Sequence, residues 1–499
     1  MADKFYVTTP LYYVNASPHI GHSYTTIAAD TLARYMRETL GSDRVFFLTG
    51  TDEHGLKIQR AADELKLSPG EFADKMVVQF KDLWSQLNIS YDDFIRTTQD
   101  RHVKVVQQAL AILYENKQIY LDKYTGFYCT PDETFWIESQ LKDGNCPDCG
   151  RPVEKISETN YFFKLSQHQD WLVEYIKKNP DFVRPQYRYN EVLRFLELNK
   201  LNDLCISRPK ERLAWGIPLP FSAEHVTYVW FDALINYISA VGDFDANNKY
   251  VSKWWPADLQ LIGKDILRQH AVYWPIMLHA LNIEPPRTVF AHGWWLIDDN
   301  KMSKSRGQVV NPLDMVHEFG IDAYRYFILR DVPFGLDGNF SQDAIIKRVN
   351  SDLANDLGNL LYRTLTMIEK YFEGNIPGED ITARSEQAKA IGLKMKNLGP
   401  AIKAHLCSSG DFNFSASLEA IWEIINMANK YIEDTKPWNL AKANKTAGLK
   451  EFILVLVDCL RGVQSQIAPF MPQTARLIAE QLGKDKIKKG KPLFPRIEK

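Results

Sequence analysis

Two short segments of the sequence bring together side chains that suit phosphate chemistry. His19 and His22 lie on either side of Gly21 in the segment PHIGH, and Lys301 and Lys304 lie in the segment KMSKS. Imidazole and ammonium groups donate hydrogen bonds to a polyphosphate and neutralise the charge that develops as it reacts. The start of a helix favours an anion as well, through its backbone N–H groups and its dipole. Glycine between the histidines would let a flat ring approach the backbone.

Each segment also has a plainer explanation, because short motifs match by chance. His19 and His22 alone are compatible with a pair of structural histidines, and KMSKS alone is compatible with an exposed loop. Both segments nevertheless occur in one chain, and each follows a predicted strand. The combination favours a shared nucleotide site.

The segments around PHIGH have the pattern of a βαβ unit. FYVTTPLYYV predicts a buried strand, HSYTTIAADTLARYMRETL a helix and RVFFLTGTDEHG a second strand. Such a unit implies a parallel sheet with helices on its faces. Ligands bind beyond the carboxyl ends of parallel strands, where PHIGH, TGTDEHG and DDNKMSKSRG are all expected. The three segments should therefore surround one ligand.

The expected fold class is α/β, in four successive parts. Residues 1–115 and 226–340 form the two halves of a Rossmann-type parallel-sheet catalytic domain, the second half with the KMSKS loop. Residues 116–225, with short aromatic strands and the segment GNCPDCGRP, form an inserted connective domain. Residues 341–499 show apolar residues at helical spacing and form an all-α bundle. The bundle ends in the basic run KDKIKKGKPLFPRIEK, which either contacts RNA or is a solvated tail.

Composition narrows the class of protein. The 499 residues carry a net charge of −2, which neither favours nor excludes a nucleic-acid partner, because phosphate binding needs only a local basic surface. No segment approaches the roughly 20 apolar residues of a membrane helix, and the first residues lack a signal-peptide pattern. We expect a cytoplasmic protein with no membrane partner. Six cysteines are too few for a disulfide scaffold.

Together, the two signatures resemble those of the class I aminoacyl-tRNA synthetases. They stand here as His19-Ile20-Gly21-His22 and Lys301-Met302-Ser303-Lys304-Ser305. Within that class the chain is most similar to the methionyl-tRNA synthetases, through TTPLYYVNASPHIGH, FFLTGTDEHG, YVWFDALINY, LIGKDILRQH, FAHGWWL and KPW. The resemblance implies ligation of methionine to tRNA(Met) through methionyl-adenylate, with ATP as a substrate, Mg²⁺ sharing its charge, and AMP and pyrophosphate released.

The resemblance also implies roles for individual residues. The residues implied to bind the phosphates of ATP are His19, His22, Lys301 and Lys304. Those implied to make the other contacts with ATP are Gly21, Asp265, Ser303 and Ser305. Asp52 binds the methionine ammonium and is oriented by Arg208. The side-chain pocket falls on Pro10, Leu11, Tyr13, Trp230, Ala233, Leu234, Tyr237, Ile266 and His270. Asn359, Arg363 and Trp438 recognise the CAU anticodon in the helix bundle.

The residue types alone leave alternatives to these roles. Asp52 in a turn-like segment is compatible with a helix cap. Trp230 and Tyr237 are compatible with ordinary core aromatics. Asn359 and Arg363, four residues apart, are compatible with a polar helix face.

A cluster of cysteines suggests a metal site that departs from the family pattern. Many relatives carry a zinc knuckle that is built from two pairs of ligands. Here the first pair is Cys129 and Asp132, and the second pair is Cys146 and Cys149. Three thiolates and a carboxylate suit tetrahedral Zn²⁺. The alternative is a lost metal site with structural thiols.

Two other functions stay open from the sequence. One is a different class I synthetase, of the cysteine or leucine type, and the other is a synthetase-derived RNA-binding protein without catalysis. The insertion looks too small for a hydrolytic editing domain. No appended dimerising domain is evident, so we expect a monomer.

Overall fold

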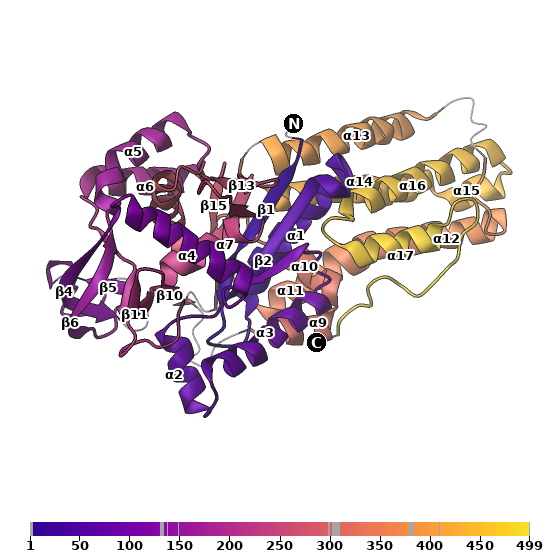
Figure 1. The fold of residues 1–499 in the computed structure, drawn as a ribbon. Helices are drawn as coiled ribbons and strands as arrows, with labels where there is room; N and C mark the ends of the chain where they lie inside the picture. Colours follow the sequence, from indigo (N-terminus) through magenta and orange to yellow (C-terminus); the bar gives the residue numbers. More distant parts are fainter. Residues whose placement is uncertain are drawn as a thin grey trace. The chain divides into compact units, whose positions relative to one another are not determined.

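The computed structural model describes residues 3–129, 134–136, 138–147, 149–297, 300–301, 310–378, 384–408 and 410–498. The chain divides into two compact units, Met1–His292 and Gly293–Lys499. Figure 1 shows the elements of each unit. The finer division into four parts at 115, 225 and 340 stays a prediction.

A six-stranded parallel sheet forms the centre of the first unit. Its order is β3-β2-β1-β14-β15-β7, and every neighbouring pair is parallel. The strands are β1 Phe5–Tyr13, β2 Val45–Asp52, β3 Asp93–Arg96, β7 Val183–Arg184, β14 Leu259–Gly263 and β15 Val289–His292. The expected α/β class is therefore confirmed. The order changes direction between β1 and β14, which is where ligands bind in sheets of this kind.

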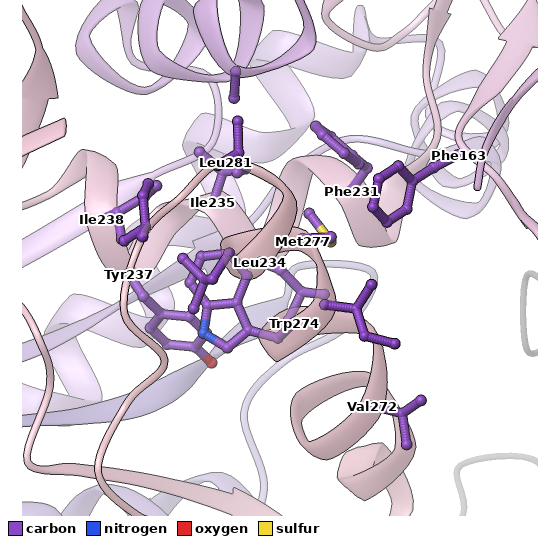
Figure 2. Packing of buried hydrophobic residues seen from close by; sticks show 14 of the residues in the cluster. Phe163, Phe231, Leu234, Ile235, Tyr237, Ile238, Val272, Trp274, Met277 and Leu281 are labelled. Carbon is purple, nitrogen blue, oxygen red and sulfur yellow. The ribbon is translucent and has the colours of Figure 1, made fainter. Parts of the chain in front are cut away.

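Helices connect and cover these strands, and Figure 1 shows α1 lying along β1 and β2. Their bounds are α1 Ile20–Leu40, α2 Leu56–Glu64, α3 Pro69–Gln86, α4 Asp100–Glu115, α7 Val229–Ser239 and α8 Trp274–Ala280. A hairpin, β12 Gly242–Phe244 with β13 Tyr250–Ser252, follows α7. Figure 2 shows how Leu234 and Tyr237 from α7 pack beside Trp274 and Met277 from α8. This apolar core holds the helices against the sheet.

An irregularity in β1 sets the position of its carboxyl end. The register between β1 and β2 shifts between Thr8 and Leu11, and beyond the shift Tyr13 pairs with Asp52. Pro10 lies inside the shifted stretch, where its missing N–H costs no ladder hydrogen bond. The bulge thus places the last residues of two adjacent strands side by side.

The inserted segment forms mostly antiparallel sheets. One contains β4 Ile119–Cys129, β5 Thr134–Trp136, β6 Glu154–Phe163 and β8 Leu204–Cys205, and the other contains β9 Ser207–Pro209, β10 Pro218–Leu219 and β11 Ser222–Thr227. Two helices lie between them in sequence, α5 Gln169–Lys178 and α6 Gln186–Leu198. The short strand β7 pairs with β15. The insertion therefore also supplies an edge strand to the main sheet, which the sequence did not predict.

Beyond His292 the chain enters the second unit. The segment RTVFAHGWWLI is divided between two strands: β15 ends at His292, and β16 Trp295–Ile297 pairs with β17 Asn300–Lys301 and β18 Gly338–Asn339. The remaining elements are helical, as predicted for residues 341–499. They are α9 Pro312–Phe319, α10 Ile321–Arg330, α11 Gln342–Arg348, the π-helix Val349–Gly358, α12 Asn359–Phe372, α13 Glu386–Lys403, α14 Phe414–Thr435, α15 Pro437–Lys442, α16 Thr446–Ile467 and α17 Pro472–Leu482. Within the described parts of the chain, the helices are too short or too polar to cross a membrane.

Candidate active site

The two histidines of PHIGH are held in place by the first turn of α1. His19 is the N-cap residue, and its Nδ1 accepts the N–H of Gly21 at 3.1 Å. Nδ1 of His22 accepts the N–H of His19 at 3.2 Å, and the two rings stack with centroids 3.8 Å apart. A ring nitrogen that accepts a hydrogen bond carries no proton, so each neutral ring has its proton on Nε2. Both Nε2 groups are therefore fixed as donors at the start of a helix.

Gly21 has a local structural role in this arrangement. A Cβ at this position would lie 3.0 Å from Cε1 and 3.2 Å from Nδ1 of His19, closer than nearly all real contacts. Glycine thus lets the His19 ring fold back over the first turn. The expected approach of adenine to the same residue stays a prediction.

A third histidine, which the sequence did not assign, lies at the same edge of the sheet. His292 is the last residue of β15 and is 3% exposed. Its Nε2 lies 2.6 Å from Oγ1 of Thr25 on α1, and the ring of Tyr24 meets it edge-on at 5.1 Å. Its place at the end of β15 brings it there, since carboxyl ends of parallel strands share one edge.

Asp52, the expected partner of the methionine ammonium, ends β2 opposite Tyr13 and is 6% exposed. The helix that follows starts at Leu56, with Gly55 as its N-cap. The alternative that Asp52 is a helix cap is therefore wrong.

The residue after Asp52 fixes the end of β2 to β3. The buried Glu53 carboxylate accepts hydrogen bonds from Nε and Nη2 of Arg96 at 2.7 and 2.9 Å. It also accepts the hydroxyls of Thr51 and Thr98, each at 2.6 Å. A buried carboxylate needs this many donors to be tolerated, so Glu53 holds the strand end rigid.

His54 begins a second buried polar network, which reaches α7. Its Nδ1 lies 2.6 Å from Asp232, whose other oxygen lies 2.7 Å from Nε2 of His102. Nδ1 of His102 lies 2.8 Å from the hydroxyl of Ser239. Burial alone would raise the pKa of Asp232, but the two histidines outweigh it, and the pKa lies below its usual value. The ionised Asp232 thus ties α7 to β2 and α4. An acid within the apolar run VTYVWFDAL was the available signal.

The residues expected around the methionine side chain come from β1, from α7 and from the segment that follows β14. Trp230, Ala233, Leu234 and Tyr237 are spaced three and four residues apart, which places them on one side of a helix. Leu234 and Tyr237 belong to the main core, and Leu11 and Ile266 pack at its border. Tyr237 is therefore a core residue, and this is compatible with its also lining a methionine pocket at the border of the core.

Tyr237 and His270 form a fixed polar pair. Nδ1 of His270 donates to the carbonyl of Ile266 at 2.9 Å, so Nε2 accepts the Tyr237 hydroxyl at 2.7 Å. His270 is 2% exposed, and burial lowers its pKa to about 4 although the hydrogen bond to Ile266 opposes the shift. The pair is therefore uncharged at neutral pH.

Arg208 lies beside a small aromatic cluster that also contacts Tyr13 and Trp230. Those two side chains pack against a small cluster of Tyr128, Ile156 and Tyr228, and the Arg208 guanidinium lies 4.4 Å from the centre of the Tyr128 ring. Its Nη2 donates to the buried Glu158 at 3.1 Å. Glu158 was not singled out from the sequence. The expected orientation of Asp52 by Arg208 stays a prediction.

The structure describes only some of the other residues that are expected to contact ATP. Asp265 is exposed on the turn Lys264–Ile266 directly after β14, and its Oδ1 occupies the space that a Cβ on Gly263 would need. Lys304, Ser303 and Ser305 lie outside the described residues, as does the side chain of Lys301.

The chain is similar to known proteins along almost its whole length. A family model described as "tRNA synthetases class I (M)" matches residues 5–155 and 150–365. Methionine–tRNA ligases from Clostridium acetobutylicum and Bacillus subtilis are 48% and 43% identical, each over 99% of this chain and 78% of the relative. A structure of Mycobacterium tuberculosis methionyl-tRNA synthetase in complex with methionyl-adenylate matches with a TM-score of 0.91 and 38% identity. That match covers 99% of this chain and 100% of the other.

The chain belongs to the methionyl-tRNA synthetase family.

In this synthetase the cysteines of the inserted segment come together. The sulfurs of Cys129, Cys146 and Cys149 all lie within 4.8 Å of one another, and those of Cys129 and Cys149 are 3.5 Å apart. Thiolates around a tetrahedral zinc, with bonds of about 2.3 Å, would be about 3.8 Å apart. The three sulfurs fit that geometry. Asp132, the fourth expected ligand, lies outside the described residues.

The residues expected to recognise the anticodon lie on helices of the second unit. Asn359 and Arg363 are one turn apart in the first half of α12, and both are partly buried. Trp438 is on the short helix α15 and is 45% exposed. An exposed tryptophan is available for stacking on an unpaired base.

The His270 pair generates a prediction about acid stability. The folded pKa of about 4 lies below the ordinary value of about 6.5, so stability is complete above pH 6.5 and is lost as the pH falls toward 4. The loss at pH 5 is about 2 kcal/mol. We expect His270→Gln to flatten the dependence of unfolding free energy on pH between 7 and 5, measured by urea titration. The exposed His317→Gln is the control, and equal slopes for both variants and the wild type would contradict the assignment.

Proposed function

We propose that this synthetase ligates L-methionine to tRNA(Met) in two steps through methionyl-adenylate. The observation that carries the proposal is the match along the full chain to a synthetase solved with methionyl-adenylate. It is supported by the two histidines at the start of α1, whose Nδ1 atoms accept backbone N–H groups and whose protons therefore lie on Nε2. Neither a cysteine- or leucine-type synthetase nor a non-catalytic RNA-binding protein has comparable support, since the relatives at 43 to 49% identity are methionine–tRNA ligases.

The first step needs alignment and charge stabilisation rather than a protein nucleophile. The methionine carboxylate attacks the α-phosphorus of ATP, a new P–O bond forms, and pyrophosphate leaves in line. His19 and His22 donate to the phosphates, and Lys301 and Lys304 neutralise charge that develops on pyrophosphate. Mg²⁺ bound with ATP shares that charge. In the second step a ribose hydroxyl at the tRNA 3′ end attacks the adenylate carbonyl, and AMP leaves.

The methionine side chain suits the border between the apolar core and the Tyr237–His270 pair. A thioether is polarizable and makes favourable contacts with aromatic rings. Because the pair is uncharged, it adds polarity near sulfur without a buried charge. In such a pocket, the binding free energies of two ligands that differ by one methylene differ by only about 1–3 kcal/mol. Norleucine and homocysteine are therefore expected to compete in part.

Methionine-dependent exchange of pyrophosphate into ATP tests the substrate. We expect exchange with methionine in the absence of tRNA, and at least about tenfold lower kcat/KM with norleucine, because the pocket loses its sulfur contacts. Exchange supported by cysteine or leucine and not by methionine would overturn the proposed substrate.

The role of His22 is tested by separating chemistry from binding. We expect His22→Ala to lower kcat of adenylate formation about 10²- to 10³-fold, because a donor to the developing charge is lost, while methionine binding changes little. Pre-steady-state adenylate formation and equilibrium methionine binding measure the two effects. The exposed His317→Ala should leave both unchanged. Equal losses of rate and binding would count against a transition-state role.

Recognition of tRNA rests on the helical unit. Trp438 stacks on an unpaired anticodon base, and Asn359 and Arg363 hydrogen-bond base edges. Support comes from the exposure of Trp438 and the shared face of α12. The cytoplasmic location and the monomeric state stay predictions.

We also propose that the cysteine cluster holds Zn²⁺ with Cys129, Cys146, Cys149 and Asp132 as ligands. Bound zinc would fix the end of β4 to the loop that carries the second pair, a structural role. Sulfur spacing supports the site, and replacing a thiolate by a carboxylate should weaken it.

A metal assay tests the zinc proposal. Protein purified without chelators should contain about one zinc per chain, and Cys146→Ser should lower the content below half, because a thiolate ligand is lost. The exposed Cys407→Ser is the control and should retain the metal. A wild-type chain that neither carries zinc nor takes it up would contradict the site.

A further inference from the structure

The basic run at the end of the helical unit is an ordered strap rather than a free tail. Residues 484–498 follow α17 and are joined to the rest of the unit by backbone hydrogen bonds. Ile376 donates to the carbonyl of Asp485 at 2.8 Å, and Ile487 donates to the carbonyl of Gly374 at 2.9 Å. Figure 1 shows the strap as the extended yellow segment that leads to the C label. The alternative that the basic run is a solvated tail is therefore wrong, because its backbone is bonded to the rest of the unit.

The strap runs antiparallel to one long helical stretch. From its start to its end, its contacts with this stretch fall on successively earlier residues, from the turn after α12 through α12 to the π-helix. Asp485 bonds Ile376, Lys489 pairs with Glu369 at 3.0 Å and lies over Tyr362, Arg496 reaches Asn355, and Ile497 exchanges two hydrogen bonds with Asn350.

The lengths of the two segments agree with this course. Helix from Asn350 to Glu369 spans about 29 Å at 1.5 Å per residue, and extended chain from Lys489 to Ile497 spans about 26 Å at 3.3 Å per residue. Pro492 and Pro495 favour an extended backbone. The strap therefore passes the levels of Asn359 and Arg363 along the helix, because both residues lie between its contacts with Glu369 and Asn355.

The strap presents its lysines outward. Ile487 is 9% exposed and packs near Gly374, whereas Lys484, Lys486, Lys488 and Lys491 are all exposed. Between 484 and 498 there are six basic and two acidic side chains. The helix beside them adds Tyr362, which is 47% exposed with the Lys489 ammonium 4.9 Å from its ring centre.

We propose that the strap and α12 together form a basic rim that binds the sugar–phosphate backbone of tRNA next to the anticodon. This inference rests on the proposed function for its partner. A row of exposed ammonium groups on a fixed backbone complements phosphates, and release of counterions supplies the affinity. Lysine acts there as a point charge rather than as a fork that reads bases. The rim thus contributes affinity that does not depend on the anticodon sequence, and Asn359, Arg363 and Trp438 supply the selectivity.

The test measures tRNA affinity over a range of salt concentrations, with the full chain. Lys488→Gln with Lys491→Gln removes two outward charges and leaves the backbone contacts of the strap in place. We expect about tenfold weaker binding and a salt slope smaller by about 1.5–2. The loss should be the same for tRNAs with other anticodons. Methionine-dependent pyrophosphate exchange should be unchanged, and Lys488→Arg with Lys491→Arg should restore binding.

The matched control is Lys389→Gln with Lys396→Gln, which removes two exposed lysines of α13 in the same unit. It should bind tRNA like the wild type. Wild-type affinity and slope in the strap variant, or an equal loss in the control, would overturn the rim. Trp438→Ala should instead reduce discrimination between anticodons and keep the salt slope. Failure of the exchange reaction in the wild type would count against the proposed function, whereas normal exchange with an unchanged strap variant would count against the rim alone.

Discussion

The parallel pairing of β1 with both β2 and β14 is the constraint on which the first unit depends. Because the strands run in one direction, their carboxyl ends and the start of α1 meet at one edge. The bulge at Pro10 then aligns Tyr13 with Asp52, and β15 brings His292 against Thr25 on α1. Segments far apart in sequence thus meet at this edge of the sheet. A slip of one residue in the β1–β2 register would turn Asp52 to the opposite face.

Buried polar networks hold this edge rigid. Glu53 receives donors from Arg96 and two threonines, and Asp232 is held between His54 and His102. In a medium of low dielectric constant such groups are costly unless they are satisfied, and satisfied networks fix one geometry. The same logic sets the imidazole tautomers of His19, His22 and His270, because one nitrogen of each ring is occupied by a backbone group. Catalysis that relies on alignment needs donors whose directions are fixed before substrate arrives.

Much of this was accessible from the sequence, and the remainder was not for identifiable reasons. Alternation of strands and helices predicted the parallel sheet, and the place of PHIGH after a strand predicted a helix start. Local patterns carry no partner information, however. Nothing near Asp232 in sequence indicates His54 or His102, and nothing near Arg208 indicates that its ion pair is with Glu158. Strand β7 is only two residues long, too short for a periodic pattern. The role of Gly21 was predicted from ligand access, whereas the structure adds a steric reason in the His19 ring.

The helical unit solves a different physical problem from the sheet. The proposed methionine pocket is a small apolar space, where one methylene changes the binding free energy by only about 1–3 kcal/mol. A tRNA offers many phosphates and a few bases, so affinity and selectivity can come from different side chains. The extended strap supplies charge without helical periodicity, since alternate residues of an extended chain point to opposite sides, and Ile487 anchors one side while Lys486 and Lys488 occupy the other. Because its backbone is fixed along α12, those charges lie at set distances from the residues expected to contact bases, and phosphate binding then positions the anticodon instead of merely attracting the RNA.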